Sequence, residues 1–404
     1  MLFISGIWFA LIQCLAALPW VWAIDPIGMS TRMKKRDFWQ VFGSTILGLA
    51  AGLTFLMKQR GDSTVLEGYG RIYGSILHLQ LLIDAMIVLP HLLLTIWPKG
   101  GAVAFAAFRE AIRQPMFWLI LILSFFLISF SMILPYFTFG EEYKMMKQLG
   151  FDISMLAPTL FGLLAASISI YDEIEGRNAI TVMSKPINRR QYFLGKYVGI
   201  LLSCICMALA LCWILTWAFH IKPFFDVLED VDDSMPQECR TALTPFFSNL
   251  GISSQGESLA IGVANWVGDA CAHHMAMLLV FGQIMVMLGI CVALATRMTF
   301  VVNLAICLII FILGRLAPVM VDVTSRTTQD GGTALQLVHF IAQLMNTVFP
   351  ALENFDVGPA VVREYQLTMT EFAGYVLPVL GYSIIYTLIA LFGGLFLFED
   401  RDLA

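Results

Sequence analysis

The residues that could do chemistry in this chain gather in one charged segment between two apolar ones. Residues 171–196 read YDEIEGRNAITVMSKPINRRQYFLGK, with LAPTLFGLLAASISI before them and YVGILLSCICMALALCWILTWAF after them. The segment carries five bases and three acids, which are Arg177, Lys185, Arg189, Arg190, Lys196, Asp172, Glu173 and Glu175. Charges of both signs at a water surface suit the docking of a partner protein, because complementary charge guides and orients binding.

The order of residues within this segment predicts a short helix followed by a second one. Three acids are expected in the first turn of the first helix, at the positive end of its dipole, namely Asp172, Glu173 and Glu175. Glu173 lies four residues before Arg177 in the favourable acid-first order, and an exposed pair of this kind is worth about 0.3–0.5 kcal/mol. Pro186 ends the helix, because the residue before a proline avoids helical angles. The second helix is expected to begin at Asn188 and to run into the next apolar segment.

The same segment resembles the signature loop of type 2 ABC-exporter permeases, the ABC-2 type. The positions that match the pattern of that loop are Glu173, Glu175, Arg177, Ser184, Lys185, Pro186, Arg189, Gly195 and Lys196. The resemblance implies that loop 172–190 docks a separate ATPase, through Asp172, Glu173, Glu175, Arg177, Lys185, Pro186, Arg189 and Arg190. The alternative interpretation is an ordinary solvated loop between two spans.

Composition places the chain in a membrane. Of its 404 residues 59% are hydrophobic and 13% are charged, against about 25% charged in soluble domains. Apolar runs long enough to cross a bilayer predict an all-helical polytopic protein with nine spans, at Leu2–Ile24, Phe38–Met57, Ile72–Trp97, 117–137, 155–171, 197–219, 271–294, 299–320 and 373–398. A net charge of −5 without a basic arm gives no indication of a nucleic-acid partner.

Residues 101–116 are amphipathic, with Arg109 and Arg113 on the polar side. They predict an elbow helix that lies along the inner leaflet and leads into the next span. Six spans follow the elbow, as in the core of the resembled family, so the resemblance covers roughly residues 100–404. We therefore expect two domains, a three-span extension at 1–99 and a six-span permease core at 100–404.

The distribution of basic residues predicts the orientation. The segments predicted to face the cytoplasm hold 14 Lys and Arg in 67 residues, whereas the predicted outer segments hold 9 in 133. Because Lys and Arg favour the cytoplasmic side, the N-terminus is expected outside and the C-terminus in the cytoplasm. The expected location is the plasma (inner) membrane of a bacterium.

Two outer segments are expected to be long. Residues 221–270 carry eight acids against Lys222 and Arg240, and they predict a small acidic external loop. Residues 333–356 contain the apolar stretch LQLVHFIAQLMNTVF, which is too short to span comfortably and predicts a re-entrant or interfacial helix. The following PALENFDV and the final FEDRDL resemble stretches near the end of the same family.

The sequence contains no phosphate loop of the Gly-x-x-x-x-Gly-Lys-Ser/Thr type. ATP and Mg are therefore expected on the partner ATPase, and no cofactor is expected on this chain. The run Cys271-Ala-His273-His274 has metal-binding residue types, but neighbouring positions of a helix do not face one site. On the outer side of the membrane only Cys239 and Cys271 could meet, and their spacing permits a disulfide without requiring one.

Three ionisable residues are predicted inside spans, where a charge is costly and often functional. Asp84 lies in the middle of the third span with His91 seven residues further on, and Arg315 lies in the eighth span. Asp84 could contact a substrate or a proton. The interpretation we favour pairs it with a polar group on another helix or leaves it protonated.

These observations together predict the transmembrane permease subunit of an ATP-driven ABC exporter, with no enzymatic activity of its own. The resemblance implies a cytoplasmic ABC ATPase as partner and a dimer with a second copy of the permease or a paralogue. A non-transporting membrane scaffold that relays ATPase motion to an external partner is the alternative. An intramembrane enzyme built around Asp84 and the histidines of the spans is a third, less favoured interpretation.

Overall fold

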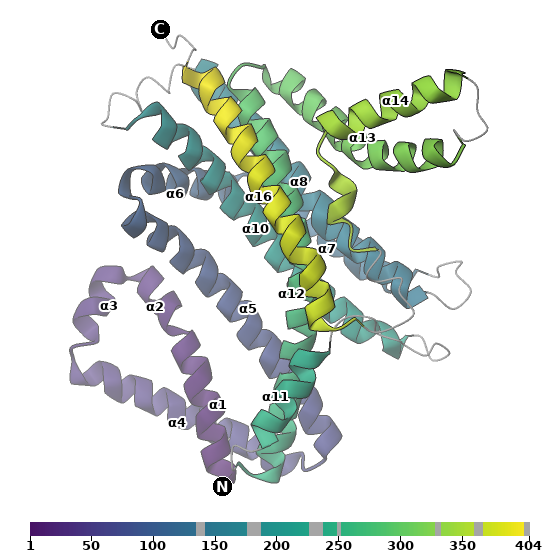
Figure 1. Cartoon of the computed structure of the whole chain (residues 1–404). Coiled ribbons are helices and arrows are strands. Elements are labelled where there is room, and N and C mark those ends of the chain that lie inside the picture. Colours follow the sequence, from purple (N-terminus) through teal and green to yellow (C-terminus); the bar gives the residue numbers. More distant parts are fainter. Residues whose placement is uncertain are drawn as a thin grey trace. The chain divides into compact units, whose positions relative to one another are not determined.

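The computed structural model describes residues 1–134, 142–175, 187–225, 237–248, 252–327, 333–358 and 367–399, and these residues form helices without a strand (Figure 1). Eight helices are long and apolar enough to cross a membrane, and a bent pair raises the number to nine within this part of the chain. The predicted all-helical polytopic fold is therefore confirmed. Contacts divide the chain into two compact units.

Unit 1 contains Met1–Leu92, Met235–His274 and Gln366–Met369. Its helices are α1 (Leu2–Ala16), α2 (Leu18–Ile24), α3 (Pro26–Arg32), α4 (Arg36–Gln59), most of α5 (Ser63–Ile96), α11 (Glu238–Ser248) and the first half of α12 (Ser254–Ala295).

Helices α5 and α12 approach each other closely in unit 1. A Cβ atom on Gly70 would lie 2.1 Å from the carbonyl oxygen of Leu259, so only a glycine allows this crossing. Beside it, the apolar core brings together Phe9, Met57, Leu66, Leu259, Ala260 and Val263. This packing explains why 235–274, predicted as part of the 100–404 core, belongs to the same compact unit as the N-terminal helices.

Unit 2 contains Leu93–Ser234, Met275–Tyr365 and Thr370–Ala404. Its helices are α6 (Pro98–Arg113), α7 (Pro115–Ser131), α8 (Glu142–Glu175), α10 (Arg189–Ile221), η1 (Lys222–Phe224), the second half of α12, α13 (Phe300–Thr327), α14 (Thr333–Val348), η2 (Leu352–Phe355) and nearly all of α16 (Met369–Glu399). The predicted re-entrant segment 333–356 thus forms a helix and a short 3-10 turn.

Two prolines set the elbow. Pro98 and Pro115 each begin a helix, and Gln114 between α6 and α7 has an extended ψ of 133°, because the residue before a proline avoids helical angles. The two helices are bent by 59° at this residue. One face of α6 is buried, whereas Arg109 and Arg113 are exposed on the other. The sequence prediction of a separate amphipathic helix here is confirmed.

Helices α6 and α10 pack backbone to backbone. A Cβ atom on Gly199 of α10 would lie 2.3 Å from the carbonyl oxygen of Ala104 in α6, and one on Gly195 would lie 2.8 Å from the Cβ atom of Val103. A side chain at either glycine would force the helices apart. The close approach brings the side chains of both helices within reach of a third helix, α8.

Three predicted boundaries were wrong. Asp172 and Glu173 lie in the last turn of α8 rather than in the first turn of a new helix, because no glycine or proline interrupts the sequence between Gly162 and Gly176. Residues 254–270, predicted as part of an external loop, are the beginning of α12. Ser253 starts that helix by accepting a hydrogen bond from the backbone N–H of Gly256.

The third boundary concerns the predicted outer connection at 58–71. Helix α4 continues to Gln59, and α5 begins at Ser63, so most of that segment is helical. Thr64 lies at this start, where its backbone N–H donates to the carboxylate of Asp62 at 3.0 Å. The start of α10, by contrast, was predicted correctly. Asn188 caps α10 and exchanges side-chain and backbone hydrogen bonds with Gln191.

Candidate coupling site

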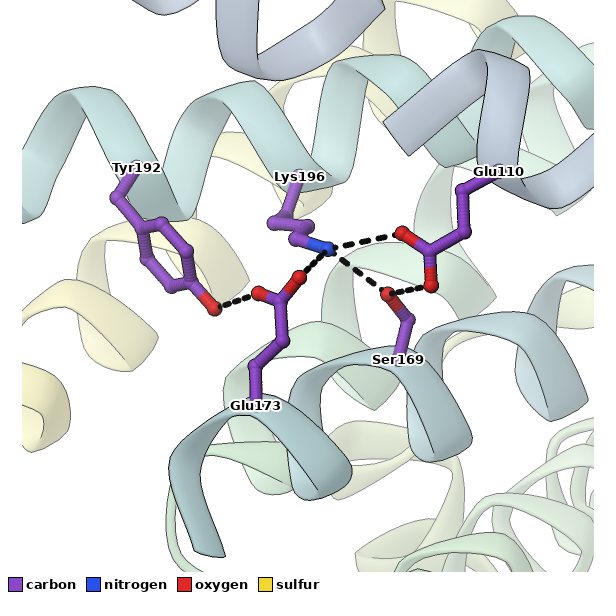
Figure 2. A network of polar contacts seen from close by, with 5 residues as sticks. All are labelled: Glu110, Ser169, Glu173, Tyr192 and Lys196. Carbon is purple, nitrogen blue, oxygen red and sulfur yellow. Dashed lines mark hydrogen bonds and ion pairs between the residues drawn. The ribbon is translucent and has the colours of Figure 1, made fainter. Parts of the chain in front are cut away.

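The polar site of unit 2 centres on a buried lysine in α10. The ammonium group of Lys196 donates to Glu173 Oε1 at 2.6 Å, to Ser169 Oγ at 2.9 Å and to Glu110 Oε2 at 3.3 Å (Figure 2). An ammonium group has three donors, so these acceptors use all of them. The side chain of Lys196 is only 5% exposed.

Glu173 is the principal anion of the site. One of its carboxylate oxygens accepts from Lys196, and the other accepts a short hydrogen bond from the hydroxyl of Tyr192, one turn earlier in α10. The side chain of Glu173 is 23% exposed. Because both oxygens are used inside the protein, this carboxylate is oriented toward α10 and is not a free docking group at the surface.

Glu110 closes the network from α6. Ser169 donates to Glu110 Oε1 at 3.2 Å while it accepts from Lys196, so the serine bridges the two charged side chains. The side chain of Glu110 is 46% exposed, and the network therefore reaches the surface at this residue. Two carboxylates share one ammonium group, which leaves a formal charge of −1.

This arrangement can hold helices together through paired charges. A buried charge is tolerated where it is paired and hydrogen-bonded, and removal of one partner of a buried pair is strongly destabilising. The network joins the last turns of α8 and the first turns of α10 to the elbow helix α6. These are the two ends of the segment 176–188, so a force on that segment acts directly on α6, α8 and α10.

A second set of contacts joins the start of α10, and the connection between α12 and α13, to the end of α16. Arg189 donates to the carbonyl oxygen of Glu399 at 2.9 Å, and Arg297 donates to that of Leu397 at 2.9 Å. Positive charge is favourable at the negative end of a helix dipole. Arg190 forms an exposed ion pair with the Glu399 side chain at 2.7 Å. Its guanidinium is therefore open to solvent and to a partner.

The residues singled out in loop 172–190 and in the elbow helix divide into three groups. Asp172 and Arg190 have exposed side chains, and Arg109 and Arg113 line a surface hollow of about 620 Å³ beside Glu110. Glu173 and Arg189 face inward, toward Lys196 and the end of α16. Arg177, Ser184, Lys185 and Pro186 lie outside the described residues, as does the side chain of Glu175.

The polar residues predicted inside spans do not form one site. Asp84 is buried near the side chain of Trp20, and its Oδ1 atom has no hydrogen-bond partner among the described residues. His91 lies against the ring of Trp22, with ring centroids 4.9 Å apart. The two residues therefore face the neighbouring helix α2.

Arg315 lies in unit 2 between α8 and α12. One guanidinium nitrogen lies 3.4 Å from Gln283 Oε1, and the group stacks over the ring of Phe311 at 5.5 Å. Its Nε atom is buried without a partner among the described residues. Within the same part of the chain, no group of three or more His, Cys, Asp or Glu could hold a metal ion.

Sequence reasoning missed three members of the network, Glu110, Ser169 and Tyr192. Lys196 matched the family pattern but was not assigned a role. One signal was available, because a lysine followed by more than twenty uncharged residues must find an anion nearby. The identity of that anion depends on the packing of α6 and α8 on α10, which the sequence does not show.

Comparison with known proteins supports the family resemblance. Residues 111–236 match the family described as ABC-2 family transporter protein. This range includes the end of α6, all of α7, α8 and α10, and four of the five network residues. Neither a curated protein nor a solved structure matches the chain. Over residues 111–236 this chain is therefore similar to ABC-2 family transporter proteins.

Proposed function

We propose that this chain is the transmembrane permease subunit of an ATP-driven exporter and that a separate cytoplasmic ATPase docks on residues 172–190 and on the exposed side of α6. The observation that carries this proposal is the Lys196 network. It fastens both ends of the charged segment to the elbow helix through buried, charge-assisted hydrogen bonds. A partner that pulled on the segment would therefore move three membrane helices together.

Exposed and buried residues have separate tasks in this proposal. Asp172 and Arg190 are exposed and are available to contact the ATPase. Glu173, Tyr192 and Lys196 hold the segment to the membrane helices. Charge reversal at Glu173 would disturb both tasks, because it would place a positive charge beside Lys196. The exposed residues therefore give the cleaner test of docking.

The test is co-purification of the permease with its ATPase, with ATP hydrolysis measured on the complex. The permease alone should not hydrolyse ATP. Arg190→Glu and Asp172→Lys should each weaken assembly more than tenfold, because loss of one partner of a buried interfacial charge pair costs on the order of 2–5 kcal/mol. Arg60→Glu is the matched control, since Arg60 is also exposed and is predicted on the opposite side of the membrane.

Two results would overturn the proposal. Robust ATP hydrolysis by the purified chain alone would contradict the role of a permease subunit. Full assembly and full activity in both variants would reduce residues 172–190 to a solvated connector. A complex that hydrolyses ATP but moves no substrate would instead favour the scaffold interpretation.

A further inference from the structure

Two cysteines that are far apart in the sequence lie in contact in unit 1. The Sγ atoms of Cys239 in α11 and Cys271 in α12 are 3.0 Å apart and are not bonded. A disulfide has an S–S distance of about 2.05 Å, so a movement of about 1 Å would allow the bond to form. Both residues are partly exposed, whereas the other six cysteines are buried.

Cys239 is held in this position by the residues on either side of it. Glu238 accepts a hydrogen bond from the backbone N–H of Met369 at 2.7 Å. Arg240 donates to Asn265 Oδ1 at 2.8 Å. The backbone of Arg240 also lies so close to Gly268 that a Cβ atom there would come within 2.8 Å of the Cα atom of Arg240. Helix α11 is therefore packed tightly against α12, with the two thiols facing each other.

We propose that Cys239 and Cys271 form a disulfide bond in the mature protein, which makes this pair an oxidation site that fixes α11 to α12. The proposal rests on the predicted orientation of residues 221–270 toward the outside, because disulfides persist in oxidising compartments. The oxidant is the disulfide of an extracytoplasmic dithiol oxidoreductase. One cysteine thiolate attacks that disulfide to give a mixed disulfide, and the second cysteine displaces the oxidoreductase as a dithiol. Two electrons and, in net balance, the two thiol protons pass to the oxidoreductase, which leaves as the dithiol.

The chain contains an internal control for this reaction. Cys291 and Cys307 also lie close to each other, since Asn303 is 3.3 Å from the first sulfur and 3.7 Å from the second. Both are fully buried, in α12 and α13. A protein oxidant cannot reach them, so proximity without exposure should leave this second pair reduced.

Differential alkylation of the full-length protein tests the proposal. Membranes are dissolved in SDS with N-ethylmaleimide, then reduced and treated with an isotope-labelled maleimide, and the peptides are analysed by mass spectrometry. Cys239 and Cys271 should carry the second label, and Cys291 and Cys307 should carry the first. In Cys271→Ser, Cys239 should change to the first label. The first label on both Cys239 and Cys271 in the unchanged protein would overturn the disulfide.

A second measurement separates failure of the disulfide from failure of the topology. Intact cells that express Cys271→Ser are treated with a membrane-impermeant maleimide. Labelling of Cys239 supports the outward orientation on which the proposal rests. If only a membrane-permeant maleimide labels Cys239, the residue lies on the inner side, and both the orientation and the disulfide are overturned.

Discussion

Lys196 in unit 2 and Asp84 in unit 1 are both ionisable side chains buried in long apolar helices, but they are stabilised in different ways. Lys196 satisfies all three donors with two carboxylates and a hydroxyl. Asp84 lies near the side chain of Trp20 and has one oxygen without a partner among the described residues. The first environment stabilises a charge, and the second does not. The rarity of ionisable residues inside spans is therefore a weaker guide to function than the number of partners that compensate the buried charge.

The largest effect is expected from the change that removes the central charge. Lys196→Met keeps most of the side-chain volume but leaves Glu173 unpaired. The free energy of unfolding should decrease by about 3–5 kcal/mol, because breaking a buried ion pair leaves an uncompensated charge. Thermal unfolding of the detergent-solubilised chain measures the change, with Lys58→Met as the control at an exposed lysine. An unchanged midpoint in Lys196→Met would remove the contrast with Asp84.

The second prediction separates the two carboxylates of the network. Glu173→Gln should cost about 1.5–3 kcal/mol, in the range for hydrogen bonds to charged groups, because this side chain is 23% exposed. Glu110→Gln should cost less than about 1 kcal/mol, because solvent screens a side chain that is 46% exposed. The same unfolding assay compares them. Equal losses would show that the two acids share the lysine evenly.

The third prediction concerns Asp84, the buried carboxyl group of unit 1. In Asp84→Asn the side chain keeps its shape beside Trp20, and the uncompensated charge is removed. Stability should stay the same or rise by up to about 1 kcal/mol, and transport by the assembled complex should be retained. Loss of transport in a variant that unfolds at the normal temperature would instead identify Asp84 as a substrate or proton contact.

The smallest effect is expected at Arg190. Its ion pair with Glu399 is exposed, with the guanidinium side chain at 70%, and pairs of this kind contribute little to folding. Arg190→Gln should leave the unfolding midpoint of the isolated permease unchanged. A decrease as large as that of Glu173→Gln would show that Arg190 belongs to the internal network and would weaken its assignment to the docking surface.

Features that depend on local chemistry could be predicted from the sequence alone. Apolar length predicted the all-helical membrane fold, the amphipathic pattern of residues 101–116 predicted a separate elbow helix, and Asn188 predicted the start of α10. Each of these features is set by residues that follow one another in the chain, so the local pattern is sufficient. The ABC-2 resemblance also depended on a short contiguous segment, and residues 111–236 confirm it.

Which side chains meet, by contrast, depends on how the helices pack against one another. Lys196 finds its partners on α6 and α8 because Gly195 and Gly199 allow α6 to lie directly against α10. Glu173 was predicted as an exposed helix-start acid because charge usually marks the end of a span, but α8 carries it beside Lys196. The contact of Cys239 with Cys271 likewise depends on how α11 packs on α12. Contacts between distant residues are fixed by the packing of whole helices, and hydrophobic pattern does not specify that packing.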